Sequence, residues 1–311
     1  MVVGELHQLP YLPELPARGV GADMIGRAGA LLVDIAIDTT ARGYRIAARP
    51  GAVSRRAESL LNEDIDALEE AWETAGAAGR TVKVQAPGPI TLAAELELAN
   101  GHRAITDPGA VRDLAASLAE GMAVQRAALA RRLSAPVVVQ FDEPMLPAAL
   151  AGRLAGVTAL TPVHPVDETL AIALLDECAT TVGGDVLLHI CAADPPWKML
   201  ARSHISAISV DVATLDADGL DGLGGLVDSG RAVVLGLVAA IAPERRPAVE
   251  EVAAAAAAVT DRLGFPRTVL GERVGISPAC GLAGATASWA RVATGLTQGA
   301  ATAIADDPAA V

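Results

Sequence analysis

The sequence contains few aromatic residues and few cysteines. Its 311 residues include three Trp, two Tyr and two Phe, although 52% of the residues are hydrophobic. A buried core must therefore be built from Ala, Val, Leu and Ile, which suits Ala-rich helices packed on aliphatic strands. The three cysteines are irregularly spaced and odd in number, which excludes a disulfide framework and favours a reduced cytoplasmic location.

Basic charge and long hydrophobic runs are also scarce. The chain has 24 Lys and Arg against 37 Asp and Glu, a formal net charge of −13. Nucleic acids and anionic membranes bind basic surfaces, so we expect neither as a main partner. No apolar run reaches the length of a membrane span without a charge, and no signal peptide opens the chain.

Short aliphatic segments alternate with amphipathic segments of helical length along most of the chain. Strands are expected at residues 82–87, 136–141, 185–190, 207–212, 232–238 and 268–278, with a further candidate at 9–16. Helices are expected at 63–77, 108–132, 166–181, 216–229, 244–263 and 283–297. The strand segments are continuous apolar runs, which is typical of strands covered by helices on both faces.

This order predicts an α/β fold with a mostly parallel sheet. No linker or shift in composition divides the chain, so we expect one catalytic domain over residues 1–311, a (β/α)8 TIM barrel. A doubly wound sheet is the alternative, but no glycine-rich phosphate loop follows a strand. A barrel closes only with all its strands, and the first is not visible, so we expect it upstream of Met1.

Potential metal ligands lie where the expected strands end. In the segment GDVLLHICAADPP, His189 and Cys191 are two residues apart and so share one face of a strand. The next strand ends in Asp211, and Cys280 follows the last strand. Together they supply one imidazole, one carboxylate and two thiols, a complete set for tetrahedral zinc. Taken singly, His189 and Cys280 are more often packed residues than ligands, and Asp211 is more often a helix cap.

Another strand end carries carboxylates. The segment VVVQFDEP places Asp142 and Glu143 before a proline that stops the strand. Such a carboxylate is suited to holding a substrate ammonium group, acting as a base or capping the next helix. Asp142 shares the parity of Gln140, so one of the two carboxylates should face the barrel interior and the other should pack outside.

These motifs resemble the catalytic domain of cobalamin-independent methionine synthase, a family within the superfamily of uroporphyrinogen decarboxylase. VVVQFDEP, HIC, SVD and SPACGLAG occur in the family's order, and the similarity covers residues 9–297. The chain looks most like the short single-barrel members of actinobacteria. The resemblance implies a zinc-dependent methyltransferase of methionine biosynthesis that activates a small thiol such as homocysteine.

The resemblance also implies roles for individual residues. His189, Cys191 and Cys280 match the family's zinc ligands, and Asp211 stands where the family usually has Glu. Asp142 matches the carboxylate that holds the amino group of homocysteine, and with Glu143 it forms the expected substrate-binding pair.

Several family positions differ. Gly26, Glu95, Ala148 and Ile241 stand where the family has a substrate-contacting glutamate, a tryptophan beneath the folate, a folate-contacting glutamate and a proton-donating histidine. The methyl donor therefore stays open between 5-methyltetrahydrofolate and a methyl-corrinoid. A barrel that binds zinc or a partner but has lost turnover is the second hypothesis. Porphyrin decarboxylation is disfavoured because the strand ends offer almost no arginine for propionates.

Overall fold

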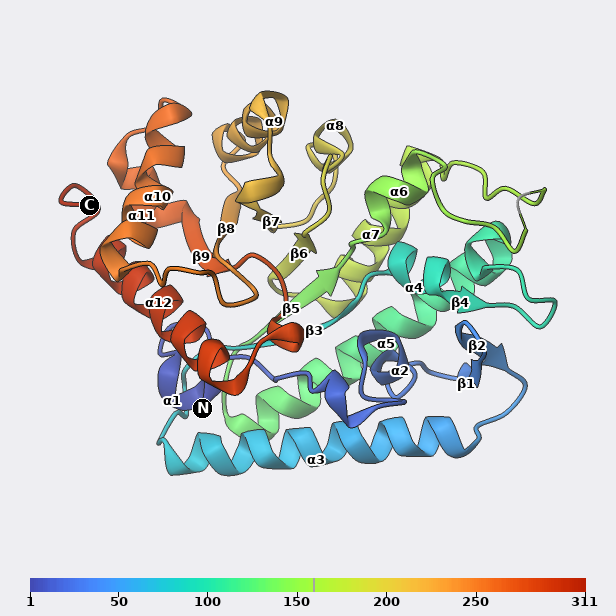
Figure 1. Ribbon diagram of the computed structural model, residues 1–311. Helices are drawn as coiled ribbons and strands as arrows, with labels where there is room; N and C mark the ends of the chain where they lie inside the picture. The colour runs from blue at the N-terminus through green and yellow to red at the C-terminus, as the bar shows by residue number, and fades with distance from the viewer. Residues whose placement is uncertain (159) are drawn as a thin grey trace.

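The structure, a computed structural model, describes residues 1–158 and 160–311. Six parallel strands form a curled sheet in the order β3-β5-β6-β7-β8-β9 (Figure 1). They are β3 (Val82–Pro87), β5 (Val137–Asp142), β6 (Val186–Ile190), β7 (Ala207–Asp211), β8 (Ala232–Val238) and β9 (Val274–Pro278). The predicted α/β class and the parallel order are confirmed, and five of the expected strands agree with these bounds to within about two residues.

Helices surround the convex side of this sheet (Figure 1). The longer ones are α3 (Ala52–Thr74), α5 (Pro108–Leu133), α7 (Glu168–Val182), α9 (Ala217–Asp228), α10 (Val249–Arg262) and α12 (Ala287–Asp306). The shorter ones are α1 (Val2–Glu5), α2 (Met24–Ala28), α4 (Pro89–Glu95), α6 (Leu146–Leu150), α8 (Trp197–Leu200) and α11 (Arg267–Arg273), with 3-10 turns η1 (Pro16–Arg18), η2 (Ala104–Thr106), η3 (Val212–Thr214) and η4 (Leu282–Gly284). No helix in the described ranges is long and apolar enough to cross a membrane.

Local sequence explains the bounds of the longest helix. Asp107 caps α5 by accepting hydrogen bonds from the backbone N–H groups of Gly109 and Ala110. Pro108 occupies the first turn, where its missing N–H leaves no hydrogen bond unmade. The helix ends at Ser134, which adopts the left-handed conformation with φ of 48°. The predicted helix 108–132 is therefore confirmed almost residue for residue.

The two faces of the sheet differ, which corrects the expectation of helices on both. From Val82 to Gln85 on β3 and along β5, every second residue is buried on the helix-covered face, and the alternate ones are half-buried on the concave face. The first set is Val82, Val84, Val137, Val139 and Phe141, and the second is Lys83, Gln85, Val138, Gln140 and Asp142. We call this largely polar concave face of β3 and β5 the trough.

The candidate strand at 9–16 lies beside β3 but forms only an isolated parallel bridge at Tyr11. The Leu12 N–H donates to Lys83 O at 2.9 Å, and the Lys83 N–H donates to Pro10 O at 2.8 Å. Among the described residues no strand joins this segment to β9, so the sheet is a half-barrel open along one side.

The expected strand 268–278 is wrong over its first half. Residues Arg267–Arg273 form α11, and only Val274–Pro278 pair with β8. Leu270 on α11 is fully buried in the core. A short apolar run does not distinguish a strand from a buried helical turn, which explains the error.

A small second sheet was not expected from the sequence. Strands β1 (Ala36–Thr40) and β2 (Gly43–Ala47) form an antiparallel hairpin, and β2 also pairs with β4 (Leu96–Glu97). The seven-residue α4 connects the carboxyl end of β3 directly to β4. Seven residues of α-helix rise only about 10 Å, so the small sheet lies on the carboxyl edge of the large one.

Candidate functional site

Three potential metal ligands meet at the carboxyl edge of the large sheet. His189 is the fourth residue of β6, Cys191 follows that strand, and Cys280 follows β9. One ligand atom from each lies within 4.8 Å of the others, and the two sulfur atoms are 3.1 Å apart. Curling of the sheet therefore brings together residues that are about ninety positions apart in sequence.

A neighbouring strand orients the imidazole. His189 Nδ1 lies 3.0 Å from Ser209 Oγ, and Ser209 is the residue opposite His189 in the β6–β7 register. Both side chains are buried. An imidazole held at Nδ1 by a hydroxyl group presents Nε2 to a ligand, which is how supporting hydrogen bonds orient metal-binding histidines. Ser209 is a positioning residue that the sequence reading did not identify.

The two thiol groups lie within hydrogen-bond distance of each other. A hydrogen bond between them lowers the pKa of Cys280 to about 4 and raises the pKa of Cys191. His189 lowers the pKa of Cys280 further. These values belong to the pair rather than to either sulfur. The arrangement favours one thiolate at neutral pH, and a thiolate is the form of cysteine that binds metal.

Asp211 is not part of this cluster. Its Oδ1 accepts a hydrogen bond from the Ala213 N–H at 2.9 Å and so caps η3. The β6–β7 register pairs Ile190 with Val210, so Asp211 lies at the level of Cys191 on the adjacent strand. The structure thus brings together His189, Cys191 and Cys280, three of the four predicted ligands. Asp211, the fourth, lies level with Cys191 but caps η3.

Asp142 faces the concave side beside the cluster. It is opposite His189 in the β5–β6 register, and its Oδ1 accepts a hydrogen bond from Gln140 Nε2 at 2.6 Å. Burial raises the pKa of Asp142, while His189 and Lys83 partly offset that rise. A half-buried carboxylate next to the cluster has unfilled capacity to accept hydrogen bonds from an ammonium group.

Glu143 points to the opposite side, so its expected role in substrate binding needs correction. The side chain is fully buried, and its two carboxylate oxygens accept hydrogen bonds from Ile90 N, Thr91 N and Thr91 Oγ1 at 2.7–2.8 Å. A Cβ at Gly88 would lie 2.3 Å from Glu143 Oε1, so glycine is required there. Burial raises the pKa of Glu143 to about 7. This carboxylate fastens β5 to the start of α4.

The trough below Asp142 holds further titratable groups that the sequence reading missed. Lys83 lies between Glu14 and Asp142, with its Nζ 5.2 Å from the Tyr11 ring centre. Burial lowers the pKa of Lys83 and raises that of Glu14 to about 7, and Arg27 partly offsets the rise of Glu14. The signal was present in VKVQ and VVVQFD, where polar residues recur at every second position.

The donor atoms fit zinc. One imidazole and two thiols form a typical zinc donor set, and tetrahedral bonds of about 2.0–2.3 Å separate ligand atoms by roughly 3.3–3.8 Å. Ligand atoms that already lie within 4.8 Å of one another match this requirement with small adjustments. A fourth position is left for Asp211 or for a substrate atom.

Comparison with known proteins agrees with these features. The family of the cobalamin-independent synthase, catalytic domain, matches residues 3–303. The chain belongs to this family. The predicted family and its methyltransferase class are therefore confirmed. No curated protein matches the chain.

A solved structure of a B12-independent methionine synthase has the same type of fold. A B12-independent methionine synthase from a Shewanella species, in complex with selenomethionine, has a TM-score of 0.55 at 15% identity, and the match covers 79% of this chain and 68% of that one. A putative vitamin-B12-independent methionine synthase from Listeria monocytogenes has a TM-score of 0.49 at 15% identity, covering 78% and 68%. The Shewanella structure supports the barrel-like α/β fold of this family member.

Proposed function

We propose that this family member is a zinc-dependent S-methyltransferase that methylates a small thiol such as homocysteine. The observation that carries the proposal is the convergence of His189, Cys191 and Cys280 at the carboxyl edge of the sheet. Reactive groups of barrel enzymes lie at this edge. The name of the Shewanella relative, a methionine synthase, supports the same reaction class.

His189, Cys191 and Cys280 would hold the metal, and Ser209 would keep the imidazole in place through Nδ1. Zinc bound there lowers the pKa of a coordinated substrate thiol and keeps its sulfur nucleophilic at neutral pH. Asp211 would be the fourth ligand if its carboxylate released the Ala213 N–H. A substrate thiol would otherwise take that position.

Asp142 would receive the ammonium group of the amino-acid substrate. Its carboxylate lies beside His189, and Gln140 fixes one of its oxygens from below. The half-barrel leaves this carboxylate partly accessible from the concave side. A thiol bound at the metal cluster would thus be held at two points, which orients its sulfur toward an incoming methyl group. The reduced thiols of the cluster suit a cytoplasmic location.

The methyl donor is either 5-methyltetrahydrofolate or a methyl-corrinoid, and one assay separates them. Zinc-loaded protein is mixed with homocysteine and either 5-methyltetrahydropteroyltriglutamate or methylcobalamin, and methionine is measured by mass spectrometry. We expect methionine with one donor and none after zinc is removed by a chelator. Binding of one zinc per chain without methionine from either donor would support the non-catalytic barrel instead.

A further inference from the structure

Lys83 places a positive charge on the inner face of β3. Val82 and Val84 on either side of it are fully buried beneath the helices, and Lys83 itself is half-buried in the trough. Removing an ammonium group from water costs free energy unless an opposite charge or a hydrogen-bond partner replaces the water. The chain has one other lysine, Lys198, which is exposed on α8. The position of Lys83 therefore calls for an explanation.

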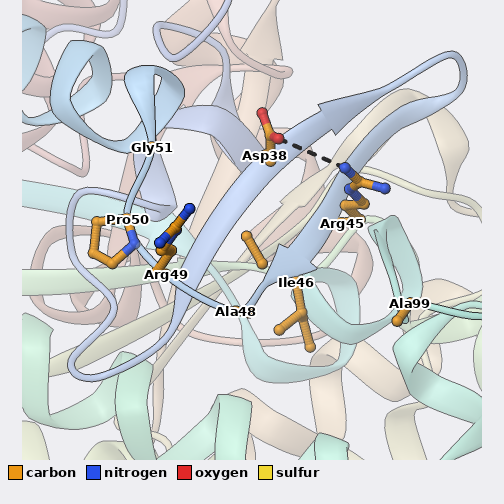
Figure 2. Close-up of a pocket in the computed structure, with 9 residues that line it drawn as sticks. Asp38, Arg45, Ile46, Ala48, Arg49, Pro50, Gly51 and Ala99 are labelled. Carbon is orange, nitrogen blue, oxygen red and sulfur yellow. Dashed lines mark ion pairs between the residues drawn. The ribbon is translucent and has the colours of Figure 1, made fainter.

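Cations elsewhere on the carboxyl edge are in a different situation. Arg45 and Arg49 line a cavity of about 400 Å³ beside the β1–β2 hairpin, and Arg45 lies 3.7 Å from Asp38 (Figure 2). Both arginines are exposed, so water can satisfy their N–H groups. Solvent accounts for these charges. Burial lowers the pKa of Lys83, in contrast, which shows that its ammonium group has lost hydration.

Contacts within the fold use little of the Lys83 ammonium group. Its Nζ donates to Gln85 Oε1 at 3.4 Å, which is longer than a normal N–H···O bond. The Nζ also lies 5.2 Å from the centre of the Tyr11 ring, a distance typical of a cation–π contact. No carboxylate in residues 1–158 or 160–311 forms an ion pair with it. Since an ammonium group has three N–H donors, Lys83 has donors to spare.

The Lys83 side chain extends along the trough toward the carboxyl edge of the sheet. The β3–β5 register pairs Gln85 with Gln140, two residues below Asp142 along β5. Because Lys83 Nζ contacts Gln85, the ammonium group reaches that level. Two residues of a strand span about 6.6 Å, so the ammonium group lies about one such step below Asp142. Burial lowers the pKa of Lys83, and of the two carboxylates that offset this, Asp142 has the larger effect, which agrees with a short separation.

The backbone fixes Lys83 from both sides. Its N–H donates to Pro10 O at 2.8 Å, and its carbonyl oxygen accepts a hydrogen bond from the Leu12 N–H at 2.9 Å. On the other side Lys83 pairs with Val138 of β5. A side chain on a rigid strand loses less entropy when it binds a ligand than one on a loop. Lys83 is therefore well placed to contribute a binding contact.

The free donors of Lys83 fit the carboxylate group of an α-amino acid. The ammonium and carboxylate groups of such a molecule share one carbon atom, so hydrogen bonds of about 2.8 Å at each end let it bridge partners roughly 6–9 Å apart. The step of about 6.6 Å between Asp142 and Lys83 lies in this range. An amino acid bound there would give both protein charges a partner, which offsets the cost of their burial.

We propose that Lys83 is a specificity-determining residue, which binds the α-carboxylate of the thiol substrate while Asp142 binds its ammonium group. The inference rests on the methyltransferase proposal, because the metal cluster and Asp142 define where the thiol and the ammonium group lie. The site then selects thiols that carry both charges, since an amine alone leaves Lys83 without a partner.

The test compares homocysteine with aminopropanethiol, which is homocysteine without its carboxylate group. Calorimetric titration of the zinc-loaded full chain measures the affinity for each thiol and needs no methyl donor. We expect the wild type to prefer homocysteine by roughly tenfold or more, because the carboxylate adds a charge-assisted hydrogen bond. Lys83→Met should lose most of this preference by weakening the binding of homocysteine alone. A wild type without the preference, or a Lys83→Met variant that keeps it in full, would overturn the proposal.

Further variants separate the charge of Lys83 from its part in folding. Lys198→Met is the matched control, since it removes the other lysine from an exposed position on α8, and its preference should equal that of the wild type. Lys83→Arg keeps a cation with N–H donors and should retain part of the preference. Circular dichroism and zinc content show whether each variant is folded, and Lys83→Gln replaces Lys83→Met if the methionine variant is not. A preference as small in Lys83→Arg as in Lys83→Met, or an equal loss in Lys198→Met, would contradict the assignment.

Methyl-transfer assays with the same variants distinguish this inference from the methyltransferase proposal. Methionine formation by the wild type, together with an unchanged KM for homocysteine in Lys83→Met, would overturn the role of Lys83 alone. A preference for homocysteine that is lost in Lys83→Met, without methyl transfer from either donor, would support Lys83 as a binding residue and overturn the methyltransferase proposal. A zinc-loaded wild type that binds neither thiol would overturn both.

Discussion

The outer and inner faces of β3 and β5 carry different kinds of side chain on the same strands. On the outer face Val82, Val84, Val139 and Phe141 are 0% exposed beneath the helices. On the inner face Lys83, Gln85, Gln140 and Asp142 are half-buried along the trough. Adjacent residues on one strand therefore have different roles: one packs in the core, and the next lies on the face that carries the cluster. Substitutions on the outer face should therefore affect stability, and substitutions on the inner face should affect chemistry.

Substitution of the cysteines should give the largest difference between the inner and outer faces, measured as bound zinc. Cys191→Ser and Cys280→Ser should each lower bound zinc from about one per chain toward zero, because a hydroxyl group is a poor zinc ligand. Cys178→Ser is the matched control, since Cys178 is buried in α7 and its Sγ donates to Ala115 O at 3.6 Å. Elemental analysis of the purified proteins measures the effect.

Two results would contradict the prediction for the cysteines. Zinc content that is unchanged in both Cys191→Ser and Cys280→Ser would show that the cluster is not the metal site. Loss of zinc in Cys178→Ser, with folding intact by circular dichroism, would show that the outer side also contributes.

Adjacent residues on β5 should differ strongly in their effect on stability. Phe141→Ala removes a fully buried ring from the outer face and should lower the free energy of unfolding by about 3–5 kcal/mol. Gln140→Ala removes an inner-face side chain and should cost about 1 kcal/mol or less. Urea denaturation measures the free energy of unfolding of both variants, provided that their m-values are equal. Similar losses in the two variants would mean that the trough is as important to the fold as the outer face.

Asp142 and Glu143 allow the same comparison of the two faces, with smaller expected changes in the free energy of unfolding. Glu143→Gln replaces an acceptor of three hydrogen bonds and should cost about 1–3 kcal/mol of stability, while zinc binding is kept. Asp142→Asn should preserve stability but raise the KM for homocysteine by about tenfold, since the ammonium group loses a charged partner. Methyl-transfer kinetics and denaturation together separate the two. A stability loss confined to Asp142→Asn would reverse the assignment.

The sequence was informative wherever a local pattern decides the structure. Asp107 and Pro108 determine where α5 begins, and the aliphatic runs of β5 to β8 determine the sheet. The hairpin β1–β2 escaped prediction because its two-residue turn, Ala41–Arg42, lacks the usual Asn-Gly or Asp-Gly signal. Its strand Gly43–Ala47 also pairs with β4, a contact between distant segments.

The site shows the same division between local and distant determinants. Strand-end position and side-chain parity correctly separated Asp142 from Glu143, and they placed His189 near both cysteines. They did not reveal that Asp211 caps η3, because a carboxylate at the end of a strand can either bind a metal or cap the following turn. Nor did they identify Ser209 or Glu14, whose roles depend on neighbours from other strands and segments.

The smallest expected effect concerns Glu14 at the inner face. Burial raises the pKa of Glu14 to about 7, so the folded protein binds this proton more tightly than the unfolded chain. The resulting stabilisation is fully present below the unfolded pKa, near 4.5, and is lost as the pH rises through about 7. Glu14→Gln should therefore flatten the decline of unfolding free energy between about pH 5 and 8 by on the order of 1 kcal/mol, because the side chain keeps some exposure. Glu58→Gln is the control, because Glu58 is exposed on α3 and lies outside the trough. If the free energy of unfolding depends on pH in the same way in Glu14→Gln and in Glu58→Gln, Glu14 does not couple folding to pH.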